Sequence, residues 1–153
     1  MMIRLAALCF LIFATTPSTG GHTQELANTA AFERAYGTSF YEFDACGDGL
    51  TGRLFRRALT DKLAQCPFTP TARSSYAKRT TAMRTRLSAT IEGMVDKNGG
   101  LPVQLEGMSN TCHEQRNTEA FQHLTEALRQ YGGGQRGIDA VIPAKCDDPD
   151  ILP

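Results

Sequence analysis

The sequence predicts a small all-α protein, a four-helix up-and-down arrangement stapled by two disulfides. Three observations support this fold class. Apolar residues recur at helical spacing in four segments, glycine and proline signals separate these segments, and four cysteines follow an apolar leader. A helical bundle buries such apolar stripes by packing them against one another. No segment of the chain reads as a convincing strand.

Residues 1–20 have the pattern of a secretory signal peptide. Arg4 is the only charged residue before Glu25, and a run of ten apolar residues is followed by small and polar ones up to Gly20. The run is shorter than the roughly 18–20 residues that a membrane-spanning helix needs, so no transmembrane segment is expected in the mature chain. We therefore expect cleavage near residue 21 and a secreted or periplasmic protein. The remaining residues, 21–153, have the length of one domain, and we expect them to form a single helical domain with a flexible C-terminal tail.

The first two predicted helices cover residues 25–43 and 51–65. Gly37 weakens the middle of the first, and a turn at residues 46–49 joins the two. The second ends before Pro67, because a residue that precedes proline is pushed out of the α region. Its apolar face consists of Leu54, Phe55, Ala58, Leu59, Leu63 and Cys66.

The third and fourth predicted helices cover residues 70–96 and 111–131. A capping box at Thr111 and Glu114 predicts the start of the fourth, and the glycines at 132–134 end it. One helical turn is expected near Ala140 in the tail. The buried stripes are Tyr76, Thr80, Met83, Leu87, Ile91 and Met94 in the third helix, and Phe121, Leu124, Leu128 and Tyr131 in the fourth.

Helix geometry selects among the three ways to pair the four cysteines. A 46–66 bridge is disfavoured, because about fifteen helical residues separate those ends by about 22 Å, whereas bridged Cα atoms lie within about 7 Å. In an up-and-down bundle the start of the second helix lies beside the start of the fourth. We therefore expect the disulfides Cys46–Cys112 and Cys66–Cys146.

The charges sum to zero but are unevenly distributed. Residues 53–91 carry nine bases against the single acid Asp61, and acidic segments lie on either side. This pattern predicts a basic face for an acidic protein or a polyanionic envelope component, such as lipid headgroups. Its candidate residues are Arg53, Arg56, Arg57, Lys78, Arg79, Arg84 and Arg86. Alternatively, the segments pack side by side and their charges complement one another. Nucleic acid is not an expected partner for an exported protein.

The sequence contains no complete motif for catalysis or for the binding of a metal or a cofactor. The segment from Asp44 resembles the start of a calcium loop, but Cys46 and Phe55 replace two required ligands. The glycine pattern at 132–137 follows a predicted helix rather than a strand, so it predicts a cap instead of a nucleotide site. A binding protein is therefore the leading expectation. The alternatives are a small hydrolase that uses Glu42, Asp44 and Asp48, or a structural, stress-related envelope component.

Overall fold

The computed structural model describes residues 24–96 and 103–152 of the 153-residue chain. The expected signal sequence, residues 1–20, lies outside the described residues. Five α-helices, a π-helical turn and a 3₁₀ turn form the described part, which confirms the all-α class. In chain order the elements are α1 (Ala30–Ser39), η1 (Phe40–Asp44), α2 (Gly49–Gln65), α3 (Pro70–Asp96), α4 (Val103–Arg116), α5 (Glu119–Gly132) and η2 (Ile138–Ala140).

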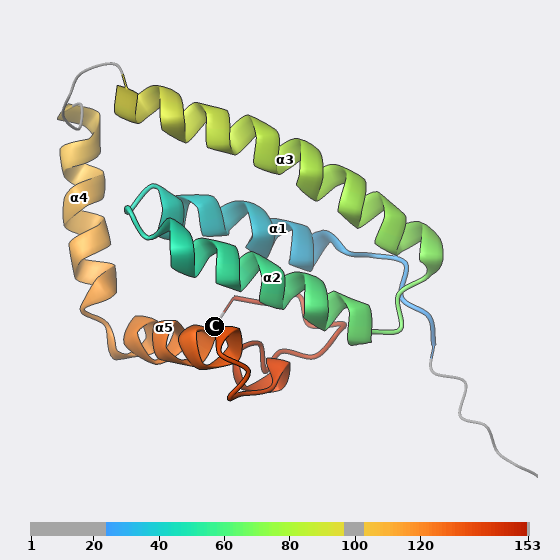
Figure 1. The fold of residues 1–153 in the computed structure, drawn as a ribbon. Coiled ribbons are helices and arrows are strands. Elements are labelled where there is room, and N and C mark those ends of the chain that lie inside the picture. The colour runs from blue at the N-terminus through green and yellow to red at the C-terminus, as the bar shows by residue number, and fades with distance from the viewer. Residues whose placement is uncertain (1–23, 97–102, 153) are drawn as a thin grey trace, which may run out of the picture.

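Helices α1 and α2 form a hairpin at the centre of the molecule (Figure 1). The long helix α3 lies along α1 on one side of this hairpin, and α5 packs against α2 on the other. Helix α4 runs across one end, between the end of α3 and the start of α5 (Figure 1). Within the hairpin, α1 therefore contacts α3, whereas α2 contacts α5 and the 3₁₀ turn η2 of the C-terminal segment.

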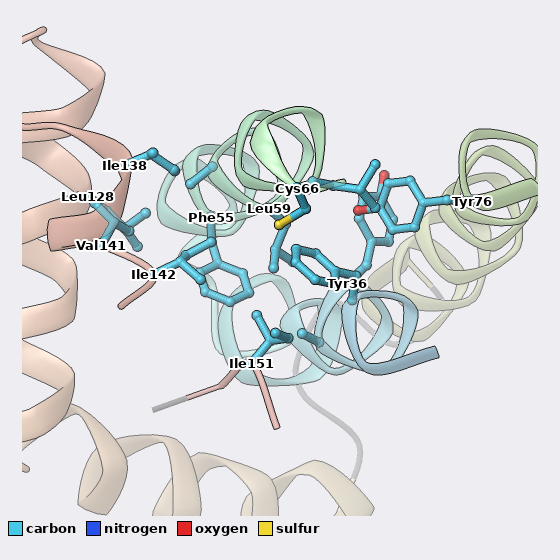
Figure 2. Packing of buried hydrophobic residues seen from close by; sticks show 14 of the residues in the cluster. Tyr36, Phe55, Leu59, Cys66, Tyr76, Leu128, Ile138, Val141, Ile142 and Ile151 are labelled. Carbon is cyan, nitrogen blue, oxygen red and sulfur yellow. The ribbon is translucent and has the colours of Figure 1, made fainter. Parts of the chain in front are cut away.

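The core lies between the hairpin and the elements around it (Figure 2). Aromatic rings from three helices meet there, and Phe43 packs against both Phe55 and Phe121 with ring centroids 5.6 Å apart. The predicted apolar face of the second helix is buried except for Leu54, which is partly exposed. Helical periodicity thus identified the buried side of α2 correctly.

Gly37 does not weaken the first helix. A Cβ atom at this position would lie 2.9 Å from the sulfur of Met83, so the glycine lets α3 pack closely on α1. The helix continues through it and into η1, and the chain turns at Gly47, whose φ of 77° suits glycine. Asp48 then caps α2 by accepting a hydrogen bond from the Thr51 amide at 3.3 Å.

The predicted fourth helix corresponds to two helices, and its predicted start is wrong. Thr111 lies inside α4, which begins at Val103, so Thr111 and Glu114 do not form a capping box at a helix start. The cap falls instead on Thr118, whose side chain accepts a hydrogen bond from the Phe121 amide at the start of α5. The break between α4 and α5 allows the chain to change direction at this end of the molecule (Figure 1).

The segment after α5 packs on the core, although the sequence predicts a flexible tail. Ile138, Val141, Ile142 and Ile151 are each at most 7% exposed. The one predicted helical turn in this segment, near Ala140, is present as η2. Hydrophobic burial is the physical reason for the difference, because these four side chains belong to the same apolar core as residues of α1, α2 and α5.

Both predicted disulfides are present. Cys46 and Cys112 lie with their Cα atoms 5.6 Å apart, and those of Cys66 and Cys146 are 5.5 Å apart. The first bridge ties α4 to the tip of the α1–α2 hairpin, and the second ties the C-terminal segment to the end of α2. Cys66 is 1% exposed and belongs to the core.

Candidate anion-binding groove

A groove of about 500 Å³ opens between the α1–α2 hairpin and the second half of α3. Four arginines contribute to its walls, three from α2 and one from α3. We call it the arginine groove. Its lining residues are Tyr36, Phe40, Asp44, Gly49, Arg53, Arg56, Arg57, Thr60, Arg84, Ser88, Ile91 and Glu92.

Arg56 is fixed in the wall of the groove. Its guanidinium donates to both carboxylate oxygens of Asp44, at 3.0 and 3.2 Å, and to the Ser39 hydroxyl at 3.1 Å. It also lies over the Phe40 ring, 4.0 Å from the centroid. Because it makes these three hydrogen bonds and its side chain is only 9% exposed, Arg56 shapes the groove and links α2 to the end of α1 and to η1.

The other three arginines of the groove are exposed to solvent. Arg57 lies 3.8 Å from Asp61, a distance beyond a hydrogen bond. Arg53 and Arg84 make no ion pair with any residue that the structure describes. The groove therefore keeps guanidinium donors available for a ligand.

Tyr36 adds a polar group to the groove. The residue is 8% exposed, and its hydroxyl makes no hydrogen bond to the described part of the chain. Burial raises the pKa of Tyr36, while the positive charges of Arg56 and Arg84 partly offset that rise. The hydroxyl thus stays protonated near neutral pH and can donate. Figure 2 shows Tyr36 beside Tyr76, at the side of the core that faces α3.

The structure divides the predicted basic face into two parts. Arg53, Arg56, Arg57 and Arg84 meet in the arginine groove, whereas the other three predicted residues lie elsewhere on α3. Arg79 pairs with Glu33 at 2.8 Å, as the complementary-charge alternative expects. Lys78 and Arg86 are exposed and do not line the groove. The seven predicted residues therefore do not form one continuous face.

Two further bases of this segment, outside the predicted set, have structural roles. Lys62 is buried and pairs with Asp139 of η2. Arg73 donates to the carbonyl oxygens of Ala64 at 2.9 Å and Phe68 at 3.1 Å, around the end of α2. Sequence reasoning missed Tyr36 and Ser88 as groove residues. Ser88 follows Arg84 by one helical turn, a spacing that could have marked it, while Tyr36 looked like an ordinary core residue.

The carboxylates proposed for a hydrolase do not gather in a cleft. Of Glu42, Asp44 and Asp48, only Asp44 lines the groove, and both its oxygens accept from Arg56. Asp48 caps α2. Burial alone raises the pKa of Glu42. No contact in the described ranges assigns these carboxylates to one reacting centre.

Within residues 24–96 and 103–152, no group of three or more potential ligand side chains is placed to hold a metal ion. No helix in those ranges is long and apolar enough to cross a membrane. Comparison of the chain with known protein families, curated proteins and solved structures finds no match.

Proposed function

We propose that this protein is an exported, non-enzymatic binding protein that engages an acidic partner through the arginine groove. The partner is an acidic protein or a polyanionic component of the cell envelope. The observation that carries this proposal is the convergence of Arg53, Arg57 and Arg84, all exposed, on one groove.

Electrostatics supports a binding role at this position. Cations grouped in a groove raise the local potential more than the same cations spread over a surface, and they speed the encounter with an anion. The anchored pair Arg56–Asp44 and the Phe40 ring hold the wall of the groove in place. A preformed site of this kind loses less conformational entropy when a partner binds.

Export is proposed from the leader pattern of residues 1–20 together with the two disulfides, which persist in oxidising compartments. Intact-mass measurement of the exported protein, alkylated with and without prior reduction, tests it. We expect cleavage near residue 21 and no alkylation before reduction. Free thiols in the native protein, or an uncleaved leader, would contradict export.

The binding proposal is tested by retention on an immobilised polyphosphate matrix and elution with a salt gradient. Arg56 and Arg79 are unsuitable for substitution because both are paired within the fold. The groove variant is R53Q/R84Q, and the matched control is K78Q/R86Q, which removes two exposed charges outside the groove.

We expect the groove variant to elute at clearly lower salt than the control, although both lose the same charge. Screening by salt weakens exposed charge pairs, so the elution position reports the electrostatic contribution. Equal elution of the two variants would refute the groove as the binding site. Failure of the unsubstituted protein to bind polyphosphate at low salt would refute the polyanion partner, and acidic peptides would then have to bind to sustain the proposal.

A further inference from the structure

We propose that the arginine groove binds a compact dianion, the phosphate group of a small phosphate monoester, between Arg53 of α2 and Arg84 of α3. This inference rests on the proposed function and narrows it. A polyanion needs only a basic surface, whereas a single dianion needs charges and donors that converge on one point. Three features of the groove favour a dianion: its charge, its donors and its size.

The first feature is charge balance. The lining residues carry four arginines and the two carboxylates of Asp44 and Glu92, which leaves an excess of two positive charges. The Arg56–Asp44 pair is neutral as a unit, so the excess comes from Arg53, Arg57 and Arg84 less Glu92. Asp61 lies outside the lining and faces Arg57 at 3.8 Å. A phosphate monoester carries about −1.5 to −2 charges near pH 7. Arg53 and Arg84, which make no ion pair with any described residue, are the two positive charges that can face it.

The second feature is the arrangement of donors. Arg53 and Arg84 belong to different helices that border the groove, so their guanidinium groups can approach one ligand from two sides. Guanidinium groups bind phosphate oxygens in pairs of parallel hydrogen bonds. The Tyr36 hydroxyl has no partner in the described chain, although Tyr36 is more than nine-tenths buried and lines the groove. The Tyr36 hydroxyl is therefore free to donate to a ligand in the groove.

The third feature is size. A volume of about 500 Å³ falls within the range of small-molecule sites. Phosphate alone fills only a part of it. Phe40 and Ile91 supply apolar surface to the same groove, so an organic group attached to the phosphate has a place to lie. The ligand class that fits is therefore a small phosphate monoester with an apolar or aromatic body.

The probe that tests this inference is phenyl phosphate, measured by isothermal titration calorimetry at pH 7.5 and low salt. Benzoate, a monoanion of similar shape, is the comparison. We expect phenyl phosphate to bind at least about tenfold more tightly, because its phosphate has a second negative charge and a third oxygen and can pair with two guanidinium groups at once, whereas the carboxylate of benzoate has one charge and two oxygens. Equal affinity for the two compounds would overturn the dianion site.

Three variants connect the binding to the groove. R53Q/R84Q is expected to weaken phenyl phosphate binding by about tenfold or more, and K78Q/R86Q by no more than about twofold. Y36F is expected to weaken it by about three- to tenfold, through loss of one donor. Circular dichroism verifies that each variant is folded. An unchanged affinity in R53Q/R84Q would overturn the assignment of this groove.

Vesicles identify the source of the phosphate monoester. If vesicles that contain phosphatidic acid displace phenyl phosphate, the ligand is a lipid headgroup. If they do not, it is a free phosphate monoester. Retention on polyphosphate without preference for phenyl phosphate over benzoate refutes this inference and leaves the proposed function standing. Absence of binding to either probe, and to acidic peptides, refutes both.

Discussion

Removal of the two disulfides one at a time should produce similar losses of stability but different structural consequences. The perturbations are C46A/C112A and C66A/C146A. Each bridge closes a long loop, since the bridged cysteines are 66 and 80 residues apart. A disulfide stabilises a fold mainly by restricting the unfolded chain, and this effect depends only weakly on loop length.

Loop lengths of this size give about 4.4 kcal/mol for Cys46–Cys112 and about 4.5 kcal/mol for Cys66–Cys146 in the chain-entropy model. These two contributions are nearly equal, whereas the packing around the two bridges is different. Cys66 is 1% exposed within the core, so its replacement by alanine leaves a small cavity that adds roughly 1 kcal/mol. The Cys46–Cys112 bridge ties α4 to the hairpin, and Arg116 of α4 also donates a hydrogen bond to the Cys46 carbonyl.

Urea denaturation followed by circular dichroism measures the free energy of unfolding, and hydrogen exchange locates the loosened segment. We expect C46A/C112A to lose amide protection mainly in α4, and C66A/C146A to lose it in the C-terminal segment and the core. Protected amides in α4 of C46A/C112A would show that packing alone holds this helix. A difference in unfolding free energy of more than about 3 kcal/mol between the variants would refute the loop-entropy reasoning.

Two further predictions concern charged residues near the groove. R56M should lower the free energy of unfolding by about 3–5 kcal/mol, because it leaves the Asp44 carboxylate without its partner. Urea denaturation measures this loss. Adding D44N to R56M should recover part of it, because the unpaired charge is then removed. Burial raises the pKa of Glu42 in the folded state. Between the unfolded-state pKa of about 4.3 and the higher folded-state pKa, the folded protein therefore holds more protons, and its stability falls as pH rises through this interval. E42Q should therefore raise the melting temperature at pH 7 but not at pH 3.5, and equal changes at both pH values would contradict the role of desolvation.

Local patterns were sufficient for most of the helices. The apolar stripe of α2 and the glycines at the end of α5 predicted those elements closely, because side-chain periodicity and capping act within a few residues. The same reasoning failed at Thr111, since a threonine three residues before a glutamate also occurs inside a helix. Only packing against the rest of the chain determined that the break falls at Thr118.

The sequence determined the all-α class, the buried face of α2 and the pairing of the four cysteines, because helix length and bundle geometry restrict which cysteines can meet. The tertiary structure decided which cations remain available. Arg56 meets Asp44, Lys62 meets Asp139 and Arg79 meets Glu33, and such pairings depend on contacts between segments that are distant in sequence. Charge is a property of each residue, but a binding site requires that several uncompensated charges converge, and only the packing of α3 against the hairpin brings Arg53 and Arg84 to the same groove.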